Sequence, residues 1–329
     1  MNPWIVEVSR GDLVESQHLG HGVVVDHAGQ VHLQFGDPER VTFPRSAAKW
    51  VQALELVASG AADTFQLTDS HLAIACASHN GEIEHTTLVG QWLQQIGLSA
   101  ADLECGIAPP FTEAVRLALA HAHETVCALH HCCSGKHAGM LSVCKQRGWP
   151  TEGYTNYDHP LQAQIRAHMA QIFQCDIETL PCATDGCSVP TYAMPLSVLA
   201  FGFARLAAGQ LEGPLRIAAA RLFQAQAAQP FMVAGTERLD TALLQAGRGR
   251  LQVKMGAEGV YCGALIDRGL GFALKCEDGS LRGQEALVVA LLSALGEDDI
   301  VTRLPEAMRS PTVVTARGQH VGKLSVRRH

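Results

Sequence analysis

The hydrophobic and polar positions of this 329-residue chain change their period twice between its two ends. Near the N-terminus apolar and polar residues alternate, and segments 4–8, 22–25 and 31–35 have the period of two that is typical of strands. The turn signal Asp26-His27-Ala28-Gly29 separates the last two. From about residue 46 to 247 apolar residues instead recur every three or four positions, which predicts helices over 47–57, 86–96, 161–173, 196–207 and 215–226.

The C-terminal part of the chain returns to the strand pattern. It predicts a tight turn at 267–269, a helix at 284–295, and strands at 251–254, 260–266, 271–275, 312–314 and 322–326. The economical architecture is one antiparallel sheet built from both chain ends with a helical insert, an α+β fold. We therefore predict a sheet-containing region over 1–45 and 248–329, a mainly helical region over 46–247, and an active site between them.

Composition and charge restrict the class of protein. Hydrophobic residues make up 47% and charged residues 17%, as in a folded globular chain, and the net charge of 25 minus 32, or -7, argues against a nucleic-acid partner. No apolar run reaches the roughly 18 residues that span a bilayer, and the N-terminus lacks the pattern of a secretory signal. Eleven irregularly spaced cysteines favour reduced thiols over a disulfide framework. These features predict a cytoplasmic protein with no membrane partner and no organic cofactor.

The first chemical motif is Ser46-Ala47-Ala48-Lys49. On a helix that begins at Pro44, Ser46 and Lys49 would lie one turn apart on one face. A serine hydroxyl needs a base, and a lysine amine can act as one if burial or a neighbouring cation lowers its pKa. The alternative interpretation is a solvent-exposed lysine at the start of a helix, without a catalytic role. The second Ser-x-x-Lys, Ser142 to Lys145, is interpreted as ordinary helix patterning.

Two further motifs strengthen the chemical interpretation. Ser78-His79-Asn80 contains one of only three asparagines, and Lys254-Met255-Gly256 falls at the end of a predicted strand. The order Ser-x-x-Lys, Ser-x-Asn, Lys-x-Gly is that of the penicillin-recognising serine enzymes. The chain has 6 lysines against 19 arginines, and three of the lysines lie in the strings Ser-Ala-Ala-Lys, Ser-Gly-Lys and Lys-Met-Gly. A solvated face could use arginine as well, but a proton-transferring amine could not.

The chain resembles the asparaginase II family, the rhizobial-type L-asparaginases, over about residues 4–326. The matching strings are Pro44-Arg45-Ser46-Ala47-Ala48-Lys49, Ser78-His79-Asn80-Gly81-Glu82, Cys133-Ser134-Gly135-Lys136-His137-Ala138-Gly139-Met140, Asp185-Gly186-Cys187, Gly235-Thr236-Glu237-Arg238 and Lys254-Met255-Gly256-Ala257-Glu258-Gly259-Val260. The resemblance implies a serine β-lactamase/glutaminase-like fold, a homodimer, and hydrolysis of L-asparagine to L-aspartate and ammonia.

The resemblance also implies roles for single residues. Ser46 would pair with Lys49, and Ser78 would pair with Lys254, to form two Ser-Lys tandems. Ser46 is favoured as the acyl-enzyme serine because the Ser-x-x-Lys serine is the nucleophile in β-lactamase-like enzymes, although the residues leave the choice open. The expected substrate-binding residues are Arg45, Asn80, His137, Asp185 and Asp240; for Asp240 a helix start is an equally good interpretation.

In the resembling enzymes two cysteines and a lysine hold a zinc ion, which maps here onto Cys133, Lys136 and Cys187. Such a Zn²⁺ would tune substrate affinity and would not generate the nucleophile. The alternative is that both cysteines are small buried thiols. The preceding His130-His131-Cys132 departs from the family, where an asparagine commonly stands, and we interpret these three residues as structural.

Some other polar residues have plain interpretations. His121 and His123 are expected on a helix surface, and Glu297-Asp298-Asp299 is expected to be a solvated turn.

Other functions stay open at this stage. A β-lactamase or DD-peptidase-like acyl transferase shares the three motifs, but it would act outside the cytoplasm. A non-enzymatic, cysteine-rich metal-binding or redox-sensing protein would not need Ser46. Glutaminase side activity also remains open, because one methylene discriminates by only about 1–3 kcal/mol in a simple pocket.

Overall fold

A computed structural model describes residues 1–328 and divides the chain into two compact units. The sheet unit consists of Met1–Ala47, Ala193–Ala208 and Ala242–His329, and the helical unit of Ala48–Tyr192 and Gly209–Thr241. Segment 193–208 belongs to the sheet unit because its helix packs on the sheet.

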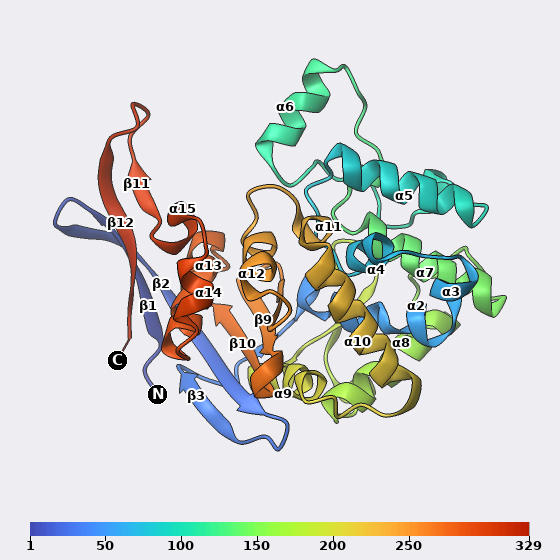
Figure 1. Ribbon diagram of the computed structural model, residues 1–329, viewed down its shortest axis with the longest axis horizontal. Coiled ribbons are helices and arrows are strands. Elements are labelled where there is room, and N and C mark those ends of the chain that lie inside the picture. The colour runs from blue at the N-terminus through green and yellow to red at the C-terminus, as the bar shows by residue number, and fades with distance from the viewer. Residues whose placement is uncertain (329) are drawn as a thin grey trace. The chain divides into compact units, whose positions relative to one another are not determined.

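The sheet unit contains one eight-stranded antiparallel sheet, which confirms the predicted α+β class (Figure 1). Its order is β11-β12-β1-β2-β10-β9-β8, and β3 pairs with β2, so strands from both chain ends meet at β1–β12 and β2–β10. The strands are β1 Trp4–Arg10, β2 Leu13–Asp26, β3 Val31–Phe35, β8 Leu251–Met255, β9 Val260–Leu265, β10 Leu270–Cys276, β11 Thr312–Val314 and β12 His320–Arg327.

Two long helices cover opposite faces of this sheet. The missing side chain of Gly271 in β10 lets α9 (Leu196–Ala207) approach, since an added Cβ would meet the backbone of Ala200 and Phe203. In β2, Gly20 makes room for Leu287 of α13 (Leu281–Ala294). Gly20 pairs with Cys276, five residues from Gly271 along β10, so the two glycines face opposite sides.

The close approach at Gly271 makes a stability prediction. We expect Gly271→Ala to lower the free energy of unfolding by a few kcal/mol, because α9 must move away from the sheet. Thermal and urea unfolding would measure it. Gly90→Ala in a helix of the other unit is the matched control. Its added Cβ makes ordinary contact with Leu129, so this change should be neutral or stabilising by about 0.5–1 kcal/mol. Equal effects of the two substitutions would contradict the packing argument.

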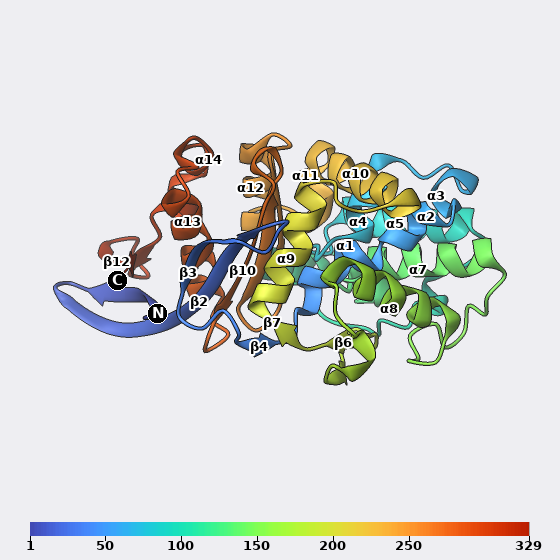
Figure 2. The same cartoon turned by 90° about the horizontal axis from the view of Figure 1, so that it is seen from below.

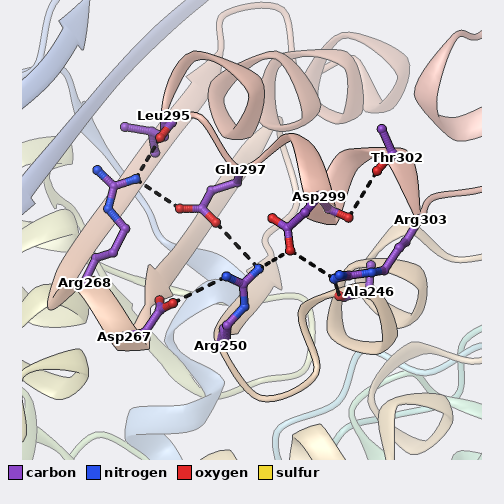
Figure 3. Close-up of polar contacts among 9 residues, drawn as sticks. All are labelled: Ala246, Arg250, Asp267, Arg268, Leu295, Glu297, Asp299, Thr302 and Arg303. Atoms are coloured by element: carbon purple, nitrogen blue, oxygen red, sulfur yellow. Dashed lines mark hydrogen bonds and ion pairs between the residues drawn. The ribbon is translucent and has the colours of Figure 1, made fainter.

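An ion-pair network closes one end of the sheet unit (Figure 3). Arg250 lies 2.6 Å from Asp299 and 3.5 Å from Asp267, and Arg268 lies 3.0 Å from Glu297. Glu297 is buried, so the expectation of a solvated turn is wrong for this residue. The turn leads into a short helix, and two arginines face the Glu297 carboxylate. The short helices of this unit are η5 Ile266–Arg268, α14 Asp298–Thr302 and α15 Glu306–Arg309.

The helical unit places α7 (Ser134–Arg147) against α4 and α5, and its residues from Ser134 to Cys144 are buried. The other helices are α1 Lys49–Gln52, α2 Leu54–Ala58, α3 Ala61–Thr64, α4 Asp69–Ala75, α5 Ile83–Gln95, η2 Ala100–Asp102, α6 Glu113–His121, η3 Ala128–His130, α8 Pro160–Phe173, η4 Ile177–Thr179, α10 Gly213–Ala228 and α11 Pro230–Ala234. Figure 2 shows α7 and α8 of this unit from a second side. The helix predicted over 47–57 is present but broken at Ala53.

The remaining elements are short. Strand β4 (Val41–Thr42) pairs with β7 (Met194–Pro195), and β5 (Cys182–Thr184) pairs with β6 (Pro190–Tyr192). The chain passes between the two units at four points, and η1 (Arg45–Ala48) and α12 (Leu239–Gly247) contain the first and the last of them. Across residues 1–328, every helix is too short or too polar to cross a membrane.

Candidate active site

Lys49 is fully buried in the helical unit and reaches the Ser78 hydroxyl. Its Nζ lies 2.9 Å from Ser78 Oγ, and within this unit it also donates to the carbonyls of Ala77 and, at 3.5 Å, Cys132. The predicted partner of Lys49 was Ser46, and that of Ser78 was Lys254. The observed Lys49–Ser78 pair therefore joins one residue of each predicted tandem. The tandems themselves join residues of different units and stay predictions.

The partners of Lys49 fit either charge state of the amine. A neutral amine has two N–H groups and one lone pair. The two carbonyls can accept both N–H groups, which leaves the lone pair for the Ser78 O–H. An ammonium group would donate its third N–H to Ser78 Oγ instead. The geometry therefore supports proton exchange between the two side chains in either direction.

The charge state of Lys49 depends on the neighbouring thiols. Burial lowers the pKa of Lys49, but the negative charges of Cys133 and Cys132 raise that pKa by more, so it lies above its ordinary value. The amine is thus an ammonium group while those thiols are ionised, which differs from the expected neutral base. It becomes a base only when the thiolate charge nearby is neutralised.

Ser78 is held by the backbone on both sides. Ser78 N donates to Val233 O at 2.9 Å, and Asn80 N donates to Ala234 O at 2.9 Å, so residues 78–80 lie along the end of α11. Between them, His79 N donates to Cys132 O at 3.3 Å. Three backbone hydrogen bonds therefore fix where the Ser78 hydroxyl points.

The side chain of Asn80 is engaged with the protein and has little capacity left for a substrate. Its Nδ2 donates to Glu82 Oε1 at 3.0 Å and Thr236 O at 2.9 Å, while Arg238 donates to its Oδ1 at 2.9 Å. Burial raises the pKa of Glu82, but hydrogen bonds from Thr236 and Asn80 outweigh this and lower it. Asn80 thus helps to position the Ser78 segment, and its expected contact with substrate stays a prediction.

Arg238 contacts the Ser78 segment, and the sequence analysis did not predict this contact, although the Gly235-Thr236-Glu237-Arg238 string was among the matching motifs. The guanidinium is buried, donates to Ser78 O at 3.3 Å, and lies 3.9 Å from the ring centre of Phe111.

Replacing Arg238 with methionine should lower kcat by about 10²-fold with a smaller change in KM. The segment that contains Ser78 would lose its hydrogen bonds from Arg238, while the substrate contacts would remain. Steady-state kinetics would show the split. Partial recovery with Arg238→Lys supports positioning, whereas unchanged kcat in the methionine variant would refute it.

In the sheet unit, Ser46 and Lys254 belong to neighbouring segments. Lys254 is buried near the end of β8, and its place at a strand end agrees with the sequence analysis. Its Nζ donates to Met255 O at 2.9 Å. A Cβ on Gly256 would meet Pro44 O at 2.5 Å, so the glycine permits the segment before Ser46 to lie against the strand end. Arg45, with φ of 51°, has a left-handed backbone conformation, which costs energy for a non-glycine residue.

The predicted metal ligands gather in the helical unit. Cys133, Lys136 and Cys187 are all buried, and Lys136 Nζ lies 2.9 Å from Cys187 Sγ. The Cys187 thiol in turn lies 3.5 Å from Asp185 Oδ2. Burial lowers the pKa of Lys136, but the charges of Cys187 and Cys133 raise it to a value above the ordinary one. Lys136 is therefore an ammonium group that donates to the Cys187 sulfur.

Glycine in the Ser134-Gly135-Lys136 string has a packing role. A Cβ on Gly135 would meet the backbone of Ile74, so only glycine lets the first turn of α7 approach α4. This approach places Lys136 beside Cys187.

His137 is buried and neutral. Burial lowers its pKa to about 4, and its Nδ1 lies 2.7 Å from Tyr154 Oη. The ring also has a hydrogen bond with the Cys187 thiol, and Lys136 is among its electrostatic neighbours. His137 therefore connects Tyr154 with the predicted metal ligands, and its predicted contact with substrate stays a prediction.

Several other histidines act as backbone caps. In each case Nδ1 accepts a backbone N–H, so the ring proton lies on Nε2 and the ring stabilises a turn. These pairs are His79 with Gly81 N, His85 with Glu82 N, His130 with Cys127 N and His131 with Cys133 N. The interpretation of His130 and His131 as structural agrees with these contacts. His121 and His123 are exposed, as expected.

The remaining predicted residues are less informative. Asp240 is buried in the first turn of α12. Ser142 of the second Ser-x-x-Lys accepts from Trp92 Nε1 and donates to Ala138 O, while Lys145 is exposed. The motif lies within α7, as expected, but the expectation of surface patterning holds only for Lys145, because Ser142 is fully buried.

A cavity of about 570 Å³ adjoins the Asn80 network. Asn80, Glu82 and Thr236 form one wall, and Val115 and Leu119 of α6 belong to the other. Ser78 is not part of its lining, so this cavity lies beside the Lys49–Ser78 pair.

Comparison with known proteins identifies the sequence class. The sequence profile of L-asparaginase II matches residues 6–326. No curated protein matches the chain. Solved structures with similarity include Mglu in its native form, with 14% identity, 85% of this chain and 60% of that chain covered, and a TM-score of 0.38. A beta-lactamase from Mycobacterium bovis has 12% identity, 85% and 95% coverage, and a TM-score of 0.35. This chain thus spans 60% of the Mglu chain.

Proposed function

Because the chain belongs to the L-asparaginase II family, we propose that it hydrolyses L-asparagine to L-aspartate and ammonia through serine hydroxyls and lysine amines. The observation that supports this most strongly is the 2.9 Å hydrogen bond between the buried Lys49 amine and the Ser78 hydroxyl. A buried amine held against a hydroxyl is the pair that amide hydrolysis without a histidine base requires.

In the proposed reaction Ser46 Oγ attacks the side-chain amide carbon, and Lys49 takes its proton. The resulting ammonium group passes a proton to Ser78, whose own proton goes to the amide nitrogen, so ammonia departs. Water then cleaves the ester by the reverse transfers, releasing aspartate. Lys254 completes the second tandem with Ser78. The Ala77 and Cys132 carbonyls orient the Lys49 amine throughout.

Arg45, His137, Asp185 and Asp240 are the proposed substrate contacts. Arg45 would pair with the α-carboxylate, because guanidinium matches carboxylate geometry. His137 offers a neutral ring beside the Cys187 thiol. Asn80, whose amide is engaged by Glu82, Thr236 and Arg238, would contribute by holding the Ser78 segment in place and by lining the adjoining cavity.

A Zn²⁺ ion fits the group of Cys133, Lys136 and Cys187, which combines two buried thiols with an amine. When bound, the cation would neutralise the thiolate charge that holds the pKa of Lys49 above its ordinary value. The proposed role of the cation is therefore to adjust the pKa of Lys49 and the affinity for substrate, and the nucleophile remains a serine.

Ammonia release by the purified protein tests the proposal, with asparagine and glutamine supplied separately. We expect release from asparagine, and a slower release from glutamine is compatible with the proposal. Turnover of nitrocefin without ammonia release from asparagine would instead support the β-lactamase-like alternative.

Light scattering on the same sample tests the homodimer that family resemblance implies.

A further inference from the structure

The turn that follows Lys254 in the sheet unit has a strained backbone. It covers residues 256–260 and joins β8 to β9, and within it Glu258 and Gly259 have φ of 59° and 77°. The left-handed conformation costs energy at Glu258, which is not a glycine. Such a turn keeps its shape only where contacts with other elements hold it.

Gln284 of α13 holds both ends of this turn. Its side chain is buried, and its Nε2 donates to the carbonyl of Gly256 at 3.2 Å and to the carbonyl of Val260. Gly256 N donates to the same Val260 carbonyl at 2.6 Å. The two N–H groups of one amide thus tie the turn to the helix and satisfy two carbonyls away from solvent.

The end of β10 holds the middle of the turn. Lys275 Nζ donates to Glu258 O at 2.6 Å and to Cys276 O at 2.7 Å. Cys276 N donates to Gly259 O at 2.7 Å. These contacts do not involve Gln284, so the loss of its amide should shift the ends of the turn without unfolding the turn.

The Gly256 end of the turn lies against the segment that leads to Ser46. An added Cβ on Gly256 would meet Pro44 O at 2.5 Å. The same Pro44 carbonyl accepts Ala47 N at 3.0 Å, in the first turn of η1, which contains Ser46. All of these residues belong to the sheet unit. A displacement of Gly256 would therefore be passed to Pro44 and to the backbone of Ser46.

We propose that Gln284 is a positioning residue for the hydrolytic reaction. Its amide fixes turn 256–260, and through this turn it fixes the backbone on which Ser46 and Lys254 are placed. This inference rests on the proposed function, in which Ser46 is the nucleophile and Lys254 belongs to the second tandem. A carboxamide does not exchange its protons as an acid or base at neutral pH, so the role of Gln284 is geometric.

Replacing Gln284 with methionine tests this role, because methionine has a similar length and volume but no N–H donors. We expect kcat for ammonia release from asparagine to fall by about 10- to 10²-fold, with KM within about threefold of the unchanged enzyme, since small displacements of a nucleophile slow the chemical step. Gln284→Leu provides a second variant if the methionine protein does not fold. Far-ultraviolet circular dichroism and urea unfolding check both.

Gln226→Met is the matched control. Gln226 is as buried as Gln284, and its Nε2 donates to a backbone carbonyl, that of Leu222 at 3.2 Å within α10. Its replacement removes a buried hydrogen bond of the same kind far from the turn in sequence, so it should lower stability comparably and leave kcat within about twofold. Equal losses of kcat in the two variants would show that Gln284 contributes only to stability, and would overturn the proposal.

Amide hydrogen exchange tests the positioning without any turnover. In Gln284→Met we expect exchange at least about tenfold faster in peptides that cover residues 43–48 and 255–261, and no such change in Gln226→Met. Unchanged exchange over residues 43–48 would overturn the inference whether or not asparagine is the substrate. Faster exchange in a protein that releases no ammonia would refute the proposed function and leave the coupling between Gln284 and the Pro44 segment standing.

Discussion

Replacing Lys49 with methionine is expected to lower kcat for asparagine hydrolysis by about 10³- to 10⁴-fold. Methionine fills similar space in the buried site but cannot accept or donate the proton that Ser46 and Ser78 exchange through the amine. Lys49→Arg should not restore activity, since guanidinium stays protonated at any working pH. Ammonia release under saturating asparagine measures the effect.

Lys145→Met is the matched control for this experiment. Lys145 ends the second Ser-x-x-Lys of the chain, but its side chain is exposed on α7. Its replacement should leave kcat within about twofold of the unchanged enzyme. If Lys49→Met kept more than a tenth of the activity while folding normally, Lys49 would not be the proton-transferring amine.

Replacing Ser46 with alanine should remove turnover almost completely, by about 10⁴- to 10⁶-fold, as when a nucleophile is deleted from a catalytic triad. The hydroxyl is the group that forms the ester in the proposed reaction, and alanine offers no substitute. Mass spectrometry of rapidly quenched enzyme should show an aspartyl adduct on the peptide that contains Ser46, and none in Ser46→Ala.

Ser310→Ala, an exposed serine in the same unit, controls for nonspecific effects. An adduct found on Ser78 in the unchanged enzyme would contradict the assignment of Ser46 as the nucleophile. It would exchange the roles of the two serines while keeping Lys49 between them.

The elements with regular patterns were predictable from sequence. Strands β3 and β11 and helix α9 have the bounds that their periodicity indicates, and the α+β arrangement follows from strand patterns at both chain ends. The first half of β2 was missed, because Glu15, Ser16 and Gln17 are polar and that part of the β1–β2 hairpin is largely exposed. No hydrophobic face marks it as a strand.

Motifs identified the residues of the candidate site but not all of its contacts. The spacing within a motif indicates only neighbours along the chain, so it predicted that Ser46 pairs with Lys49. The structure instead shows a hydrogen bond from Lys49 to Ser78, 29 positions away in the sequence. The bond from Arg238 to Asn80 spans 158 positions and has no sequence signal beyond the string that contains Arg238. Such pairs depend on tertiary packing, which a single sequence does not reveal.

From the sequence alone, a buried histidine could be either a metal ligand or a cap of the backbone. A histidine beside cysteines, such as His131, suggests a metal ligand, but its Nδ1 is committed to the Cys133 amide. The hydrogen-bonded atom decides between a cap and a ligand, and this information exists only in the structure.

The measurement that tests the account most directly is a double-mutant cycle between Lys49→Met and Ser78→Ala, scored by kcat/KM for asparagine. Residues that pass one proton act as a unit, so either single change should remove nearly all that the pair contributes. We expect the double variant to be no more than a few-fold slower than Lys49→Met alone. Losses that multiply in the double variant would show that the two side chains act independently, and would contradict proton transfer through the Lys49–Ser78 hydrogen bond.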